Sequence, residues 1–317
     1  QVVTGCPGQT PERQYAARGH VFGEGQPLAA HPQPSGQALT QPGTLKCTKA
    51  IGRYIDEYGI AQVSMNITNI HVTPLHKAFD EVCRCAQQRG LRVTGTEIVG
   101  LIPKSTLIDA GNYFLEKQQR STGIPEDDVV KMAVRSMGLD DLKPFNVREK
   151  VIEYLLEDAG KGARLADLTV KAFAEETSRE SPAPGGGSIA AYMGALGAAL
   201  GTMVANLSSH KRGWDARWQE FSTWAVNGQQ LMRRLLALVD EDTRAFNQIM
   251  DAFGLPKGTD EEKRQRTAAI QAATLNATQV PLQTMKAAYE AFALCRAMAA
   301  EGNPNSVSDA GVGALAV

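Results

Sequence analysis

Residues 181–209, SPAPGGGSIAAYMGALGAALGTMVANLSS, decide the fold of the second half of the chain. No residue in this stretch is charged, and its length would suffice to cross a bilayer. However, it contains two prolines and six glycines, and alanine is commoner in it than leucine. This composition favours a helix packed inside a protein, so we expect a buried helix over 187–208 and no membrane span.

The expected helix begins directly after Gly185, Gly186 and Gly187, which precede Ser188. Successive glycines leave backbone N–H groups unobstructed, and at a helix N-terminus these donors and the helix dipole favour an anion. No Gly-Lys-Ser/Thr follows and no strand precedes, which excludes a P-loop and a dinucleotide fingerprint. The spacing leaves two interpretations open, an ordinary loop with a helix cap or a contact for an anionic ligand.

The rest of the second half is also helical in pattern. Apolar residues recur every three or four positions over about 165–177, 214–254, 260–276 and 278–301, and again from about 306. We therefore expect an all-α helical bundle over 165–317.

The first half mixes two periodicities. Residues 61–70 and 92–101 resemble strands, whereas helices are expected after Pro74 and over 104–118 and 125–137. This order predicts a small α/β sandwich over 44–158, so the fold class of the whole chain is α+β. Residues 1–43 are rich in Gly, Pro and Gln, which predicts a disordered leader, and 159–164 are expected to form a linker.

Composition excludes several function classes. The chain has 33 Lys and Arg residues against 34 Asp and Glu residues, and only 6% of its residues are aromatic. Neither the charge balance nor the aromatic content indicates nucleic-acid binding. Five cysteines in a chain of this length argue against a disulfide framework, and no signal peptide is evident, so we expect a cytoplasmic protein. Cys83 and Cys85 point in different directions on a helix and lack further ligands, so no metal is expected.

The helix expected over 214–254 carries an acid on its apolar face. The apolar stripe comprises Leu231, Leu235, Leu238, Phe246, Ile249 and Phe253. Asp242 lies four residues from Leu238 and from Phe246, on this stripe, whereas Asp240 is rotated by about 200° and should face water. Burial of a carboxyl is costly, and it shifts the group toward general acid/base chemistry near neutral pH. A catalytic carboxyl and a structural polar contact inside the bundle both remain open.

Several segments together resemble one family. The first half contains Pro42-Gly-Thr-Leu-Lys46, Ile51-Gly-Arg-Tyr-Ile-Asp-Glu57, Ile60-Ala-Gln-Val-Ser-Met-Asn66 and Val99-Gly-Leu-Ile-Pro103. The second half contains Ala183-Pro-Gly-Gly-Gly-Ser188, Asp240-Glu-Asp-Thr-Arg-Ala-Phe246 and Leu255-Pro-Lys257. In order and spacing, these segments resemble the formimidoyltransferase-cyclodeaminases of histidine degradation over about residues 41–317.

The resemblance implies two folate-dependent activities. The family's transferase moves a formimino group from formiminoglutamate to tetrahydrofolate, and its cyclodeaminase closes the product to 5,10-methenyltetrahydrofolate with release of ammonia. The resemblance implies that Asp242 is the catalytic carboxyl of the cyclodeaminase and that Leu45 contacts folate. We interpret Gly185, Gly186, Gly187 and Ser188 as a contact for the pterin or a carboxylate.

The resemblance also implies partners and domains. Tetrahydrofolate would be a cosubstrate, and glutamate or formiminoglutamate would be a further ligand. No metal would be needed. The protein would assemble as a homo-oligomer. Residues 44–158 would be the C-terminal subdomain of the transferase, and 165–317 a cyclodeaminase domain shortened at its C-terminus. Residues 1–40 do not resemble the family.

The departures from the family pattern leave two other functions open. The transferase's catalytic histidine belongs to an earlier subdomain, and His71 and His76 do not match it, so we expect both to be structural and transferase activity to be absent. A methenyltetrahydrofolate cyclohydrolase and a non-catalytic folate-binding or oligomer-forming fragment are the alternatives. A cluster of basic residues comprises Lys211, Arg212 and Arg217. These side chains either form a solvent-exposed face or bind the polyglutamate tail of a folate.

Overall fold

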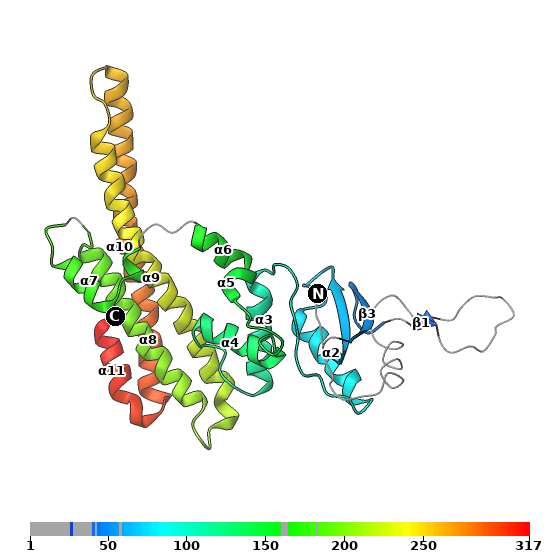
Figure 1. Ribbon diagram of the computed structural model, residues 1–317. Helices are drawn as coiled ribbons and strands as arrows, with labels where there is room; N and C mark the ends of the chain where they lie inside the picture. Colours follow the sequence, from blue (N-terminus) through cyan, green and yellow to red (C-terminus); the bar gives the residue numbers. More distant parts are fainter. Residues whose placement is uncertain (1–25, 28–39, 42, 57–58, 160–163, 182) are drawn as a thin grey trace. The chain divides into compact units, whose positions relative to one another are not determined.

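The computed structural model describes the chain except for residues 1–25, 28–39, 42, 57–58, 160–163 and 182 (Figure 1). Most of the predicted leader and linker lies outside the described residues. The described residues within Gln1–Lys117 and Glu126–Gly160 form one compact unit, and those within Gln118–Pro125 and Lys161–Val317 form the second. Strands and helices build the first unit and helices alone the described second unit, which confirms the α+β class.

A β-hairpin forms one part of the first unit. β3 (Thr48–Ile55) runs antiparallel to β4 (Ile60–Ile67), with Thr48 opposite Ile67. β1 (Gln26–Pro27) and β2 (Thr40–Gln41) also pair, with two residues each. The strand predicted over 61–70 is confirmed as β4. β3 escaped prediction because Lys49, Gly52 and Arg53 interrupt its apolar pattern, and Ile51 is 58% exposed.

The strand predicted over 92–101 is wrong. This segment is extended, but it belongs to no named strand. The amide of Thr96 donates to the carbonyl of Gly138, and that of the nearby Ile102 donates to Lys150. Both acceptors lie outside named strands, so the segment's apolar residues are held against the core without a strand ladder.

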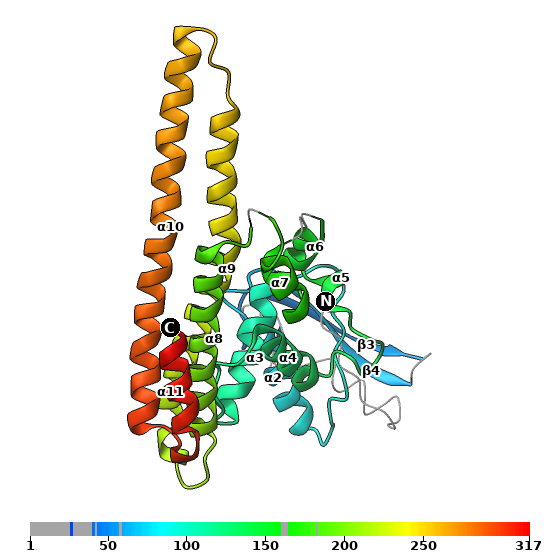
Figure 2. The ribbon, with the colours of Figure 1, turned by 90° about the vertical axis from the view of Figure 1, so that its left-hand side faces the viewer.

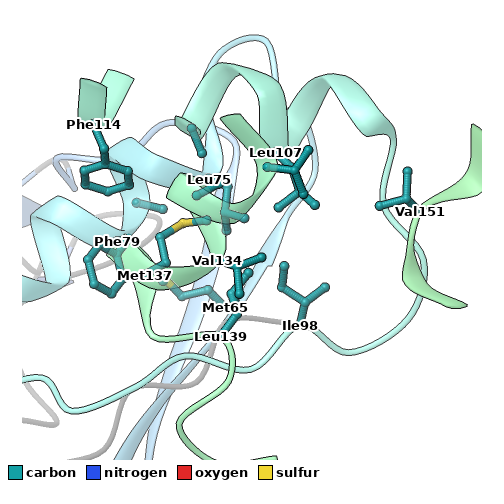
Figure 3. Close-up of a cluster of buried hydrophobic side chains, with 14 of the residues drawn as sticks. Met65, Leu75, Phe79, Ile98, Leu107, Phe114, Val134, Met137, Leu139 and Val151 are labelled. Atoms are coloured by element: carbon teal, nitrogen blue, oxygen red, sulfur yellow. The ribbon is translucent and has the colours of Figure 1, made fainter. Parts of the chain in front are cut away.

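The helices of the first unit enclose its core. They are α2 (Leu75–Gln87), α3 (Lys104–Lys117), α4 (Glu126–Met137), α5 (Val147–Lys150) and α6 (Ile152–Ala159). Figure 3 shows how Met65 of β4 meets Phe79 of α2 and Met137 of α4 in this core. The predicted helices after Pro74 and over 104–118 and 125–137 are thus confirmed.

The second unit is built around α8 (Gly186–Ser209), which packs against α9 (Trp218–Gly254), α10 (Asp260–Glu301) and α11 (Val307–Ala316). Ahead of α8 come the short helix η2 (Leu165–Asp167) and α7 (Val170–Thr177). Among the described helices, only α8 is long and apolar enough to cross a membrane, and 56% of its most apolar window is buried inside the unit. The predicted interior helix is confirmed, and its small residues allow the close packing.

α9 and α10 form a long antiparallel pair that extends beyond α8 and α11 (Figure 2). The predicted break between 276 and 278 is wrong, because α10 is continuous and accommodates Pro281. The apolar stripe predicted on α9 is buried at Leu235 and Leu238, but Phe246 is 40% and Phe253 51% exposed.

The loop between α3 and α4 belongs to the second unit, although from the sequence we expected it in the domain of residues 44–158. Within Gln118–Pro125, the amide of Ser121 donates to His210 Nε2 at 3.2 Å, and that of Thr122 donates to Ser222 Oγ at 3.1 Å. Asn206 Nδ2 donates to the carbonyl of Gly123 at 2.8 Å. These bonds fasten the loop to the end of α8 and the beginning of α9.

We expect acidification to destabilise this loop. His210 Nε2 accepts a hydrogen bond only while unprotonated, and burial, together with the charge of Arg120, lowers the pKa of His210 below 6.5. The unfolded chain therefore binds the proton more tightly, so the stabilisation is complete above about pH 6.5 and is lost as the pH falls through the lowered folded-state pKa.

Thermal unfolding at about pH 7.5 and about pH 5.5 checks this expectation. The decrease in Tm should be smaller in His210→Gln, whose amide oxygen can accept the Ser121 bond at both pH values. His76 is present in both proteins and cancels in the comparison. Equal decreases would contradict a role for His210.

Candidate functional site

The first turn of α8 meets the middle of α9 at Asp242. Ser188 Oγ lies 3.0 Å from Asp242 Oδ2 and 3.0 Å from the carbonyl oxygen of Val239, and it can donate to either. Thr243 Oγ1 lies 3.4 Å from the same hydroxyl. Ser188 is fully buried and Asp242 half-buried, so the hydroxyl holds the carboxylate from the interior side.

Gly187 brings the carboxylate against the backbone of α8. A Cβ at this position would lie 2.2 Å from Asp242 Oδ1 and 2.6 Å from its Cγ, which no side chain permits without a shift. At Gly185 and Gly186 a Cβ would meet nothing within 4 Å. The glycine turn therefore has one crowded position that faces Asp242 and two open positions beside it.

The first turn of α8 has the electrostatics of an uncapped helix N-terminus. Gly185 is the N-cap residue and provides no side-chain cap for the first backbone N–H groups. These donors and the helix dipole favour negative charge, which Asp242 supplies in part. No described Lys or Arg forms an ion pair with Asp242. A carboxylate of this kind can take up and return a proton.

Asp240 occupies a different environment from the one predicted. It is half-buried rather than facing water, because its Oδ1 accepts a hydrogen bond of 2.7 Å from the amide of Leu165. This bond fastens η2 to α9 across a long separation in sequence. The periodicity of α9 alone could not reveal it, just as it could not reveal the contact of Asp242 with Ser188.

The structure places the other candidate residues elsewhere. Leu45 belongs to the first unit, where it is half-buried against the core of that unit. His76 is buried and stacks on Tyr113 at 4.5 Å between ring centroids, while His71 is exposed. Burial lowers the pKa of His76, so a neutral packing role fits it.

The basic residues after α8 are engaged in local contacts. Lys211 Nζ lies 4.2 Å from the centre of the Trp214 ring, and Arg217 pairs with Glu220 and Glu301. They follow the C-terminal end of α8, whose 24 residues span roughly 36 Å. The basic residues are therefore separated from the glycine turn by the length of this helix.

The described residues contain no group of three or more His, Cys, Asp or Glu side chains that could hold a metal ion. Cys83 is half-buried and Cys85 buried, and neither forms a disulfide with another described cysteine. Burial is the main cause of the raised pKa of Cys85, which suits a structural thiol.

Two family profiles match the chain. One, described as formiminotransferase-cyclodeaminase, matches residues 169–317. The other, described as the formiminotransferase domain, matches residues 24–157. The second match includes residues 24–40, which the motifs quoted in the sequence analysis do not cover.

Curated relatives match over most of the chain. The formimidoyltransferase-cyclodeaminases of Gallus gallus and Rattus norvegicus are 37% and 36% identical over 90% and 92% of this chain. The match covers 53% of each relative, so the chain spans about half the length of these proteins. A methenyltetrahydrofolate cyclohydrolase of Methylorubrum extorquens is 40% identical over 46% of this chain and 71% of its own length.

A similar protein is also found among the solved structures. It is the formiminotetrahydrofolate cyclodeaminase of Thermotoga maritima, with 25% sequence identity and a TM-score of 0.41. The similarity covers 48% of this chain and 74% of that one.

Proposed function

The chain belongs to the formiminotransferase-cyclodeaminase family, and we propose that its helical unit carries out the cyclodeamination of 5-formiminotetrahydrofolate. The contact of Ser188 with Asp242 beside the glycine turn is the observation that carries this proposal. Tetrahydrofolate is then the carrier of the reacting carbon, as expected for a folate-dependent family. The Asp242 site offers the acid/base group that the reaction needs.

In the proposed reaction, Asp242 moves one proton. The formimino group enters as an amidinium, and N10 of the folate attacks its carbon while the Asp242 carboxylate accepts the N10 proton. Asp242 then returns this proton to the amino group of the tetrahedral intermediate. The C–N bond breaks, ammonia leaves, and the 5,10-methenyl cation remains, so charge and protons balance. General acid/base catalysis of this type contributes roughly 100- to 10,000-fold to the rate.

The residues beside Asp242 support this chemistry in different ways. The open positions at Gly185 and Gly186 allow an anionic or polar part of the substrate to approach the first N–H groups of α8. Gly187 makes room for the carboxylate. Ser188 is buried, so we propose that it positions Asp242 rather than touching the substrate.

Ser188→Ala is expected to lower kcat for ammonia release by about 10- to 100-fold, because Asp242 loses the hydroxyl that orients it. The lost hydrogen bond should also cost about 1 kcal/mol of stability. Ser208→Ala is the matched control, since Ser208 is equally buried on α8 and donates to the carbonyl of Val204 at 2.7 Å.

Steady-state kinetics and thermal unfolding of both variants check this expectation. The control should lose stability but keep kcat. If the two variants lose activity equally, Ser188 has no positioning role beyond its contribution to the fold.

A second function is favoured by the Methylorubrum relative, which is named a methenyltetrahydrofolate cyclohydrolase and is 40% identical over 46% of this chain. The profile match over residues 24–157 favours the cyclodeaminase, because it is described as a formiminotransferase domain. Parallel assays with 5-formiminotetrahydrofolate and 5,10-methenyltetrahydrofolate separate the two functions. Ammonia release supports the cyclodeaminase, and faster hydrolysis of the methenyl compound without ammonia release supports the cyclohydrolase.

We further propose that residues 44–158 are a C-terminal subdomain of the transferase, with Leu45 as a folate contact, and that 165–317 are the cyclodeaminase domain. The profile matches over 24–157 and 169–317 support this division. Spectroscopic titration of folate with Leu45→Ala tests the contact, since unchanged affinity would exclude it.

We propose that the chain assembles with copies of itself. Exposed apolar residues along α10 support this proposal, among them Met285 at 67%, Tyr289 at 80% and Phe292 at 46% exposure. Light scattering tests it, because a monomer mass at micromolar concentration would exclude the assembly. We also propose a cytoplasmic location, because the described cysteines form no disulfide with one another, and cell fractionation tests it.

A further inference from the structure

Phe246 is an exposed aromatic residue one turn after Asp242 on α9. At about 100° per residue, it is rotated by only about 40° from Asp242 and so shares its face of the helix. Phe246 is 40% exposed, which leaves part of its ring accessible. Side chains of a helix lean toward its N-terminus, which at Phe246 is the direction of Asp242. The ring therefore belongs to the surroundings of this carboxylate.

The register between α8 and α9 places Phe246 at the beginning of α8. A Cβ at Gly194 would lie 3.2 Å from Leu235 Cδ2. Ser188, nearer the N-terminus of α8, bonds to Asp242, farther along α9, so the two helices run antiparallel. Phe246 lies roughly 6 Å beyond Asp242 along α9, whereas α8 begins only roughly 3 Å before Ser188. The backbone of Phe246 is thus level with the chain that precedes α8.

Three kinds of group meet at this end of α8. Asp242 provides a carboxylate, Phe246 an aromatic ring, and the first turn of α8 its uncapped N–H groups. A Cβ at Gly186 would meet nothing within 4 Å, so the approach to this turn is open. No ring or cation of the described residues stacks on Phe246, whereas Arg266 lies 5.7 Å from the centre of the Phe253 ring. The accessible face of Phe246 is therefore available to a planar ligand.

We propose that Phe246 positions the p-aminobenzoyl ring of the folate by stacking on it. The proposal rests on the proposed function, in which the Asp242 carboxylate accepts the proton of N10. N10 is bonded directly to the p-aminobenzoyl ring, so a substrate whose N10 reaches the carboxylate brings this ring next to Phe246. Stacking fixes the plane of the ring and with it the direction from which N10 attacks the formimino carbon.

Phe246→Leu tests this role in the kinetics of ammonia release. Leucine keeps an apolar surface but removes the flat ring, so KM for 5-formiminotetrahydrofolate should rise by about three- to tenfold, with a smaller fall in kcat. Phe246→Tyr retains the ring and should keep KM within about twofold of the native value. A KM that leucine leaves unchanged, or that tyrosine raises as much as leucine does, would overturn the proposal.

Phe253→Leu is the matched control. Phe253 lies on the same face of α9, roughly 10 Å farther from Asp242 than Phe246 does, and is 51% exposed. Its replacement should leave KM and kcat near their native values. An equal rise of KM in both leucine variants would mean that the apolar face of α9 as a whole supports binding, and that Phe246 has no specific role.

A second copy of the chain is the alternative occupant of this surface. Light scattering at equal concentrations separates the two, because the proposal predicts the same mass for the native chain and for Phe246→Leu. A lower mass of the variant, together with its raised KM, would assign Phe246 to a contact between copies and reject the stacking on folate.

An NMR titration with pteroylglutamate locates the stacked ring directly. The proton signals of its benzoyl ring should move upfield on binding to the native chain and much less with Phe246→Leu, whereas the C7 proton of the pterin should respond equally to both proteins. Dependence of the pterin signal alone on Phe246, or of neither signal, would overturn the proposal.

The titration requires no turnover, so Asp242→Asn should give the same upfield movement as the native chain. Ammonia release without the effect of Phe246 on the benzoyl signals would reject this inference alone. The effect of Phe246 without ammonia release would reject the proposed cyclodeaminase alone.

Discussion

Asp242→Asn is expected to lower the rate of ammonia release from 5-formiminotetrahydrofolate by roughly 100- to 10,000-fold. The amide keeps the shape of the side chain and can still accept the hydrogen bond from Ser188, 3.0 Å away in the native protein. It cannot take the proton from N10 or return it to the departing nitrogen. The folate affinity and Tm should therefore stay near their native values while kcat falls.

The control for this variant is Asp240→Asn. Asp240 is two residues away, also half-buried, and its carboxylate serves the amide of Leu165. Its replacement should affect stability and leave kcat close to native. Stopped-flow absorbance for product and titration calorimetry for folate separate the two effects. Equal losses of kcat in both variants would mean that charge near this part of α9, and not proton transfer by Asp242, supports the reaction.

Gly187→Ala is expected to be the second most damaging change. The added Cβ would lie 2.2 Å from Asp242 Oδ1, so the carboxylate must move away from the first turn of α8. Misplacement of a catalytic group by about 1 Å can cost roughly 100-fold in rate. Stability should not fall in proportion, because the displaced atoms are the end of a side chain and alanine is a better helix former than glycine.

Gly186→Ala provides a control for the position of Asp242 in the same turn, compared at saturating substrate because its added methyl group also narrows the proposed approach of the substrate and is expected to raise KM. A Cβ at this position meets nothing within 4 Å, so the carboxylate stays in place. The kcat of Gly186→Ala should exceed that of Gly187→Ala by at least about tenfold, while Tm differs little between them. Equal kcat values, measured by the same absorbance assay, would show that the close approach of Asp242 to α8 is unimportant.

Much of the fold was predictable because it depends on local patterns. The uncharged, small-residue stretch of α8 predicts an interior helix, and the prolines and glycines around α2 mark its ends. The errors arose where partners distant in sequence decide the outcome. Residues 92–101 have strand-like composition, but the backbone of Thr96 bonds to the carbonyl of Gly138 instead of a strand.

The candidate site shows the same limit. Helical periodicity places Asp242 on the inner face of α9, and the glycines predict an accessible turn before α8. No pattern in the sequence predicts that Ser188 bonds to Asp242 or that Gly187 faces it, because each contact joins residues more than fifty positions apart. The same reason explains why Asp240, expected in water, is bonded to Leu165.

The most direct test of the central claim is a time course of ammonia and 5,10-methenyltetrahydrofolate formation from 5-formiminotetrahydrofolate, with this chain and its Asp242→Asn variant side by side. We predict that the native chain forms both products in equal amounts and that the variant forms neither above the uncatalysed rate. Equal rates in the two proteins, or no product from either, would contradict the assignment of cyclodeaminase catalysis to Asp242 at the first turn of α8.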